Sequence, residues 1–309
     1  MKVMVAGSTG LAGSAISRKF LKLGAEVIGV NSSIVNLTRR EQTFEFLKDI
    51  RPDVVIDAAA RVGGIGANDS YPVDFLSVNL QIQTNLMDAS HEAGVERFIF
   101  LGSSCIYPRD CPQPIKEEYL MTGPLEKTNS AYAVAKISGI ELINSYRKQY
   151  GHQWISVMPT NLYGSNDNFD LETSHVLPAL VNRFVTAQES GAKAVTLWGS
   201  GKPRREFLHV DDLASAIVVL LEKYDESYHI NVGTGVDIPI AELAEMIAHL
   251  AGFKGQIAWD SSKPDGTPRK VLDVSRISGL GWRPEITLEQ GIEDVIKDFQ
   301  AMRGKGKDS

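Results

Sequence analysis

The segment SAYAVAKISG contains a tyrosine and a lysine, Tyr132 and Lys136, four residues apart. On a helix this spacing places both side chains on one face. A phenol with its ordinary pKa of about 10 is too weak an acid for easy proton exchange at neutral pH, and a neighbouring ammonium group is expected to lower that pKa. The pair could then act as an acid or base. Because Tyr-x-x-x-Lys also occurs by chance on solvated helices, the pair needs support from other segments.

A second group of reactive side chains lies in FLGSSCIYP, residues 100–108, where an apolar strand is predicted to emerge. Ser103 and Cys105 alternate along this strand end, so we expect their side chains to face one pocket and Ser104 to face elsewhere. A thiol has a pKa of about 8.5 and can exchange protons around neutrality. The alternative is that these small residues only fill a tight buried corner.

A glycine-rich turn, GSTGLAG at residues 7–13, lies between a predicted strand at 2–6 and a predicted helix at 11–23. Backbone amides at a helix N-terminus attract a pyrophosphate, and glycines let phosphates approach the chain closely. A structural turn is the alternative, but the strand–turn–helix context favours nucleotide binding.

The end of the second predicted strand, residues 26–30, bears on the choice between NAD and NADP. An acidic residue there would bind the ribose hydroxyls and repel a 2′-phosphate. This chain has Asn31, Ser32 and Ser33 instead. The neutral side chains favour NADP(H), although no arginine in this stretch fixes the choice.

These segments must be positioned by alternating strands and helices. The predicted strands of near-continuous apolar character are 2–6, 26–30, 54–59, 97–103, 155–158 and 229–233, and the predicted helices between and after them include 40–48, 75–93, 130–150, 210–224 and 238–252. Such a pattern indicates a Rossmann-like, doubly wound parallel α/β sheet with ligands at the carboxyl ends of its strands. We expect a dinucleotide-binding domain at 1–163 with a return at 205–233, and a smaller mixed α/β substrate lobe at 164–204 and 234–309.

Composition restricts the partners. The chain has 309 residues, 43% of them hydrophobic and 23% charged, and a net charge of −6. This balance gives no general attraction to nucleic acid or to an anionic membrane. Apolar runs stay below the roughly 18 residues that span a bilayer, and no signal-peptide pattern is visible. With two cysteines only, we expect no disulfide framework, no metal site and a cytoplasmic location.

In this order, GSTGLAG, DAAA (57–60), GSS (102–104) and YAVAK (132–136) resemble the extended short-chain dehydrogenase/reductase superfamily. Within it, the chain is most similar to the GDP-L-fucose synthase family. That similarity extends over nearly the whole chain through ARVGGIGAN (60–68), LGSSCIYP (101–108), SVMPTNLYGSNDNF (156–169), SHVLPALV (174–181), LWGSGKPRREFLHVDD (197–212), HINVGTG (229–235) and SKPDGTPRK (262–270).

The resemblance implies roles for individual residues. Ser103, Tyr132 and Lys136 match the reductase triad, and Cys105 and His175 match the epimerase base and acid. The residues that match the NADP(H) site are Gly7, Ser8, Thr9, Gly10, Leu11, Ala12, Gly13, Asn31, Ser32, Ser33, Ala58, Ala59, Leu101, Gly102, Ser104, Lys136, Pro159, Thr160, Asn161, Leu162 and His175. Those that match GDP-sugar contacts are Arg183, Trp198, Arg205 and, within the stretch 263–269, Lys263, Asp265 and Arg269.

The chain departs from the family pattern at the 2′-phosphate site. Some family members have an arginine in the glycine loop and another after the second strand. Here Thr9 and the Asn31–Ser33 stretch occupy those places. The preference between NADP and NAD therefore stays open at this point.

The resemblance implies an NADPH-dependent enzyme that epimerises GDP-4-keto-6-deoxy-D-mannose at C3 and C5 and reduces C4 to give GDP-L-fucose. It also implies a homodimer. An enzyme acting on another nucleotide-linked keto sugar, such as a GDP-keto-heptose, is the nearest alternative. A 4,6-dehydratase is disfavoured because the Thr-Asp-Glu set of those enzymes does not follow the strand-end serine. A cofactor-sensing binding protein is disfavoured because such proteins commonly lose the Tyr–Lys pair.

Overall fold

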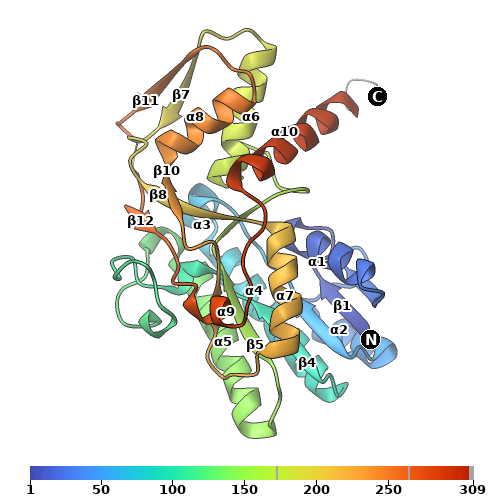
Figure 1. The fold of residues 1–309 in the computed structure, drawn as a ribbon. Helices are drawn as coiled ribbons and strands as arrows, with labels where there is room; N and C mark the ends of the chain where they lie inside the picture. The colour runs from blue at the N-terminus through green and yellow to red at the C-terminus, as the bar shows by residue number, and fades with distance from the viewer. Residues whose placement is uncertain (172, 264, 306–309) are drawn as a thin grey trace.

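The computed structural model describes residues 1–171, 173–263 and 265–305 of the chain. Pro264, which belongs to the predicted substrate-binding stretch, and Glu172 and 306–309, which belong to the predicted second lobe, lie outside the described residues. The described residues form a lobe on a six-stranded sheet, and a second lobe above it in Figure 1.

The six-stranded sheet is parallel throughout and has the strand order β2-β1-β3-β4-β5-β9. Its strands are β1 (Lys2–Ala6), β2 (Glu26–Val30), β3 (Val54–Asp57), β4 (Arg97–Leu101), β5 (Ile155–Pro159) and β9 (Ile230–Val232). All four residues of β3 are buried, as a strand covered on both faces requires. The predicted doubly wound parallel fold is confirmed.

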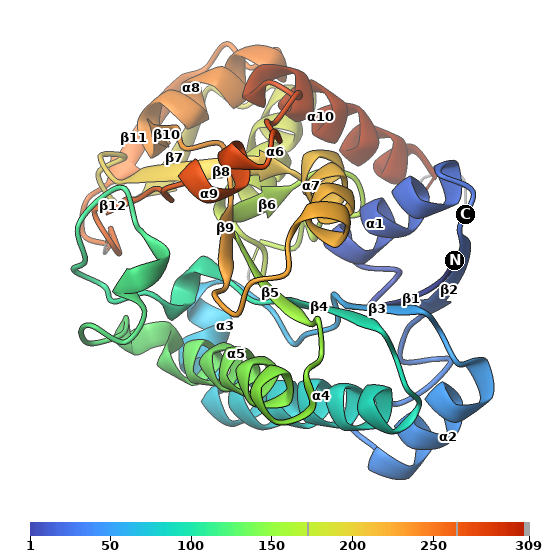
Figure 2. The same cartoon turned by 60° about the horizontal axis from the view of Figure 1, so that its bottom comes forward.

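Helices cover both faces of this sheet, as Figure 2 shows. One face carries α1 (Leu11–Lys22) and α7 (Val210–Lys223); the other carries α2 (Arg40–Ile50), α4 (Pro72–Glu92) and α5 (Ser130–Tyr150). Side chains of β1 alternate between the two layers: Val3 and Val5 pack in the core beneath α1 and α7, whereas Met4 and Ala6 pack in the other core. Both faces are therefore buried by amphipathic helices.

The second lobe contains two small sheets and three longer helices. In the first sheet β8 (Arg204–His209) pairs with β6 (Asn161–Tyr163), β10 (Asp237–Pro239) and β12 (Arg269–Lys270); in the second β7 (Ala194–Trp198) pairs with β11 (Gln256–Asp260). The helices are α6 (Val176–Glu189), α8 (Ile240–Leu250) and α10 (Leu288–Lys305), and their apolar faces share one core. The predicted domain boundaries stay a prediction.

Short helices complete the described part of the chain. They are α3 (Ile65–Ser70), η1 (Ser104–Ile106), η2 (Glu117–Tyr119), η3 (Lys127–Asn129) and α9 (Ser275–Gly279). Among the helices of the described ranges, none combines the length and the apolar character needed to cross a bilayer.

Candidate active site

The glycine loop joins β1 to α1 and packs too closely for side chains at two of its positions. A Cβ at Gly13 would lie 2.1 Å from the Gly7 carbonyl oxygen, and a Cβ at Gly7 would lie 2.6 Å from the Ala58 carbonyl oxygen. Gly7 also has a φ of +73°, which disfavours other residues. Gly10 caps α1 without a side-chain hydrogen bond, so the first amides of the helix are not satisfied by a side-chain cap. This bare helix N-terminus fits the pyrophosphate of a dinucleotide.

The end of β2 forms a compact polar turn next to this loop. Asn31 Oδ1 accepts hydrogen bonds from the Ser33 amide at 2.9 Å and from the Ser33 hydroxyl at 2.6 Å. Ser32 and Ser33 are exposed. The turn thus presents neutral groups and no carboxylate where the adenosine ribose of a dinucleotide would lie in this fold.

The corner after β4 differs from its predicted shape. The strand predicted over 97–103 ends at Leu101, and Ser104–Ile106 form the 3-10 helix η1, so Ser103 and Cys105 do not alternate along a strand. Instead Ser103 caps η1, and its Oγ accepts a hydrogen bond from the Cys105 amide at 3.2 Å. Ser104 is buried, while Ser103 and Cys105 stay partly exposed. Ser103 and Cys105 are thus more exposed than Ser104, as expected, but a helical turn produces this difference and an extended strand does not.

Tyr132 and Lys136 lie on α5, as predicted, and the tyrosine reaches the same corner. The hydroxyls of Tyr132 and Ser103 are hydrogen-bonded, and the Cys105 thiol is close enough to act electrostatically on Tyr132. Phe75 packs edge-on against the Tyr132 ring, with the ring centroids 6.3 Å apart. Ser103, Cys105 and Tyr132 thus meet at the carboxyl edge of the sheet.

The expected lowering of the Tyr132 pKa is wrong for this structure. Burial raises the pKa of the phenol, and the charges of ionised Cys105 and of Asp57 raise it further, while the hydrogen bond from Ser103 lowers it. The Lys136 nitrogen lies 5.9 Å from the Tyr132 ring centroid and donates to the Leu101 carbonyl oxygen at 2.8 Å. Tyr132 is therefore held as a protonated acid.

A cation that the sequence did not single out completes the cluster. Lys270, on β12, donates to the Cys105 sulphur at 3.5 Å. His175, the N-cap of α6, has an exposed surface, yet the protein atoms packed around its imidazole lower its pKa, and the Lys270 charge lowers it further. Since one ammonium group acts on both the thiol and the imidazole, the predicted base and acid lie on the same site.

The second lobe adds aromatic and basic side chains, of which Arg205 lies near this cluster. Trp198 is 68% exposed at the end of β7, and the Lys263 nitrogen lies 5.6 Å from its ring centroid. Burial lowers the pKa of Arg205, whereas the nearby Cys105 and Asp265 charges raise it, so this guanidinium lies between the thiol and the loop at 265. An exposed indole with neighbouring cations suits a base and a diphosphate.

Two of the predicted substrate contacts are already engaged within the protein. Asp265 accepts from the Ser200 amide at 2.6 Å and from the Ser200 hydroxyl at 2.7 Å, which fastens the 265–268 loop to the turn after β7. Arg269 forms an ion pair with Asp237. Asp265 is therefore suited to positioning the loop, while Arg269 presents a guanidinium whose charge is partly balanced.

The remaining predicted residues fall on neighbouring elements. Pro159 is the last residue of β5, and Leu162 on β6 packs against the core beneath α1 and α7. The Thr160 and Asn161 side chains both donate to the Glu206 carbonyl oxygen, at 3.4 and 2.7 Å. Arg183 lies on α6, two turns after His175.

Sequence reasoning missed two residues. Lys270 directly follows the predicted Arg269, but the two-residue strand that brings it to Cys105 has no sequence pattern. Asp57 ends β3 with its side chain fully buried. The sequence did contain a signal for Asp57, because an acidic residue ends an apolar strand there and fully buried carboxylates are normally paired or functional.

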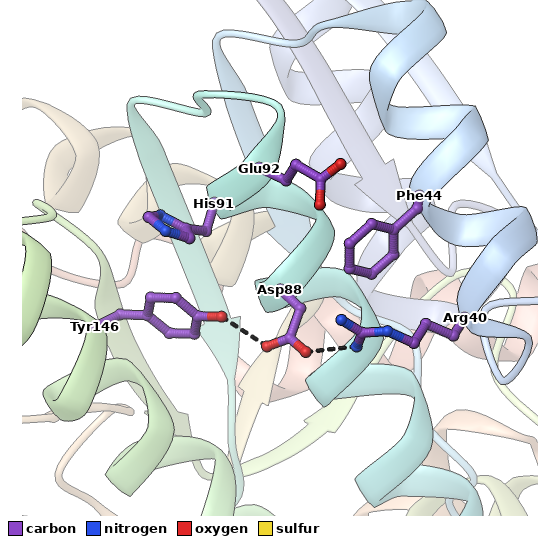
Figure 3. A pocket seen from close by; sticks show the side chains of 6 residues that line it. All are labelled: Arg40, Phe44, Asp88, His91, Glu92 and Tyr146. Atoms are coloured by element: carbon purple, nitrogen blue, oxygen red, sulfur yellow. Dashed lines mark hydrogen bonds and ion pairs between the residues drawn. The ribbon is translucent and has the colours of Figure 1, made fainter.

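A hollow of about 390 Å³ lies elsewhere, on the outer face formed by α2, α4 and α5 (Figure 3). Asp88 at its centre accepts from the Tyr146 hydroxyl and from Arg40, each at 2.6 Å, and Arg40 also lies over the Phe44 ring. None of the predicted site residues lines it. The contacts of Asp88 with Tyr146 and Arg40 stabilise the walls of this hollow, which is separate from the candidate active site.

Known proteins match the chain over most of its length. The family model described as the NAD dependent epimerase/dehydratase family matches residues 3–233. GDP-L-fucose synthase 1 of Arabidopsis thaliana is 52% identical over 295 residues, which cover 95% of this chain and 91% of that protein. GDP-L-fucose synthase of Escherichia coli strain K12 is 48% identical over 308 residues, which cover 96% of each chain.

A solved structure agrees in fold. A GDP-mannoheptose C4 reductase from Campylobacter jejuni with NADP bound superposes with a TM-score of 0.90 at 33% identity, covering 97% of this chain and 98% of that one. The match to the family model covers the glycine loop, the Ser103 corner and the Tyr132–Lys136 pair. This chain belongs to the NAD dependent epimerase/dehydratase family.

Proposed function

We propose that this protein epimerises GDP-4-keto-6-deoxy-D-mannose at C3 and C5 and then reduces C4 with NADPH to give GDP-L-fucose. The observation that carries the proposal is the meeting of Cys105 with Ser103 and Tyr132 at one strand end. A generic reductase needs only the hydroxyl pair and the lysine. The thiol, with Lys270 beside it, adds a base for a second reaction in the same site.

In the epimerisation, the C4 ketone acidifies the protons on C3 and C5. At each carbon in turn, Cys105 as the thiolate removes the proton and protonated His175 returns a proton to the other face of the ring. Proton exchange with water restores both groups between the two carbons. The low pKa of His175 makes its imidazolium a ready proton donor. The hydroxyls of Ser103 and Tyr132 hydrogen-bond the C4 oxygen, where negative charge collects in the enolate.

In the reduction, a bound nicotinamide supplies the hydride that C4 accepts. Tyr132 gives its proton to the C4 oxygen, so one hydride and one proton together convert the ketone to the alcohol. Ser103 holds that oxygen through its hydroxyl. Lys136 keeps two further donors after its bond to the Leu101 carbonyl oxygen, and these are available to a ribose.

For the cofactor we propose NADP(H). The bare N-terminus of α1 supports a dinucleotide, and the Asn31–Ser33 turn supports tolerance of a 2′-phosphate. The solved relative with NADP bound supports the same choice. For the substrate we propose that Trp198, Lys263 and Arg205 hold the GDP part, with Arg183 and Arg269 as further cations.

We propose that the protein acts as a homodimer in the cytoplasm. The dimer rests on the family resemblance, and the cytoplasm is supported by two cysteines that are both free thiols. Sedimentation equilibrium tests the dimer. A mass of about one chain at micromolar concentration contradicts it.

A second substrate has specific support. The solved relative named a GDP-mannoheptose C4 reductase shares the fold over nearly the whole chain. A GDP-keto-heptose is therefore the alternative substrate. The two readings are separated by direct comparison of kcat/KM for the two keto sugars.

The deciding experiment supplies GDP-4-keto-6-deoxy-D-mannose and NADPH, or NADH, in deuterated water. We expect NADPH oxidation with deuterium at C3 and C5 of the product. Oxidation of neither cofactor contradicts the reductase, and reduction without deuterium leaves a plain 4-reductase. Cys105→Ser should abolish the exchange yet still reduce an already epimerised ketone; exchange that persists in this variant rejects Cys105 as the base.

A further inference from the structure

Asp57 is a carboxylate buried where the site meets the sheet. It is the last residue of β3 and is 0% exposed. Its Oδ1 accepts a hydrogen bond from the Ala59 amide at 3.1 Å, while its Oδ2 is buried without a hydrogen-bond partner among the described residues. An ionised carboxylate with an unpaired buried oxygen is costly unless an opposite charge lies near.

The nearby opposite charge belongs to Lys136. Asp57 pairs with Phe100 across the β3–β4 ladder, and the Lys136 nitrogen lies 4.7 Å from the Phe100 ring centroid. The same nitrogen donates to the carbonyl oxygen of the next residue, Leu101. Lys136 is itself only 3% exposed. The ammonium and the carboxylate therefore share one dry region between α5 and the strand ends.

The two groups act on each other. Burial raises the pKa of Asp57 to about 6, and the Lys136 charge lowers it. Burial lowers the pKa of Lys136, and the Asp57 charge raises it. Within the described residues, Asp57 also acts on Tyr132 of α5, whose pKa it raises. Burial thus disfavours the charged form of both groups, and the charge on each group favours the charged form of the other.

Asp57 also lies next to the residues that contact the glycine loop. The residues directly after it, Ala58 and Ala59, are those against which Gly7 packs. A charge here lies between the glycine loop and the Tyr132–Lys136 pair. No member of the predicted catalytic set supplies this negative charge.

We propose that Asp57 is a positioning residue for the reduction, acting through Lys136: its carboxylate keeps the buried ammonium group protonated and in place beside Tyr132. The proposal rests on the reductase function above. When Asp57 is protonated in mildly acidic solution, the ammonium loses its counter-charge. Loss of the carboxylate lets both Lys136 and Tyr132 release protons at lower pH. The decline of the reduction rate in alkaline solution should then begin at a lower pH.

The first test is the pH profile of NADPH oxidation with an already epimerised ketone. Asp57→Asn keeps the shape of the side chain and the acceptor for the Ala59 amide. We expect its alkaline limb to move to lower pH by on the order of one unit, the effect of a nearby opposite charge. We also expect the acidic limb to flatten around pH 6, where Asp57 titrates. A profile identical to that of the unmodified protein overturns the proposal.

Asp167 provides a matched control. It too is buried, with Oδ1 bonded to a backbone amide and Oδ2 without a partner in the part of the chain that the structure describes, and no charged group is among the causes of its raised pKa. Asp167→Asn should leave the pH profile unchanged. An equal shift in both variants would mean that loss of any buried carboxylate has this effect, and the assignment to Asp57 would fall.

The second test needs neither substrate nor cofactor. Infrared difference spectra between pH 5 and pH 8 report protonated carboxyl groups, and the band missing in Asp57→Asn belongs to Asp57. In Lys136→Met the midpoint of this band should move to higher pH, because the charge that favours the carboxylate is gone. An unchanged midpoint overturns the pairing, whatever keto sugar the protein uses; where Asp57→Asn folds poorly, Asp57→Ser assigns the band.

Discussion

The Lys270 ammonium nitrogen lies 3.5 Å from the Cys105 sulphur, although 165 positions separate the two residues in the chain. A donor with a positive charge favours the thiolate, which is the form that removes a proton. The pairing of β12 with β8 brings the lysine there. Lys270 should therefore matter to the epimerisation far more than to the reduction.

Replacing Lys270 with methionine tests this relationship. Lys270→Met keeps the length of the side chain and removes its charge, and we expect deuterium exchange at C3 and C5 to slow by roughly 10- to 100-fold, because the positive charge next to the reacting sulphur is lost. Reduction of an already epimerised ketone should change by much less. Lys270→Arg should retain most of the exchange. Lys116→Met, which removes a half-exposed lysine outside the site, should have no effect; equal losses in both half-reactions contradict the assignment.

The pH dependence of exchange should report His175. Packing and the Lys270 charge hold the pKa of His175 below its ordinary value, so its imidazolium is present only in more acidic solution. The exchange rate should thus fall as the pH rises, along a limb whose midpoint lies below about 6.5, the ordinary histidine pKa. In Lys270→Met that limb should move to higher pH, since the repulsion between two positive charges is removed. His175→Asn should lack the limb, and a limb that persists there belongs to another group.

The features that sequence predicted well are those set by local pattern. The glycine turn and the helix carrying Tyr132 are encoded by neighbouring residues, and both appear as expected. Lys270 was missed because a two-residue strand places it. The Tyr132 pKa was predicted in the wrong direction because helical spacing gives the proximity of Lys136 but neither the burial of the phenol nor the bond to Leu101.

The glycine loop gives a prediction about packing alone. An alanine at Gly13 would press its Cβ against the Gly7 carbonyl oxygen at 2.1 Å, whereas one at Gly10 would lie 3.4 Å from the same atom. Backbone cannot yield as a side chain does, so Gly13→Ala should lower the melting temperature of the cofactor-free protein by several degrees, for a cost of about 1–3 kcal/mol. Gly10→Ala should change it little. Similar melting temperatures for the two variants would contradict the close approach seen here.

Asp167 should make the stability of the protein depend on pH. Burial raises its pKa to about 7, so the folded state holds a proton that the unfolded chain, with a pKa near 3.8, releases. Its favourable contribution is complete below pH 3.8 and is lost as the pH rises through about 7. Asp167→Asn removes this loss. We expect urea unfolding to show this in the free energy of unfolding. On going from pH 5 to pH 8, the variant should become more stable relative to the unmodified protein by on the order of 2 kcal/mol. A difference that is the same at both pH values would show that the carboxyl group is already ionised at pH 5, and that its burial does not hold the proton.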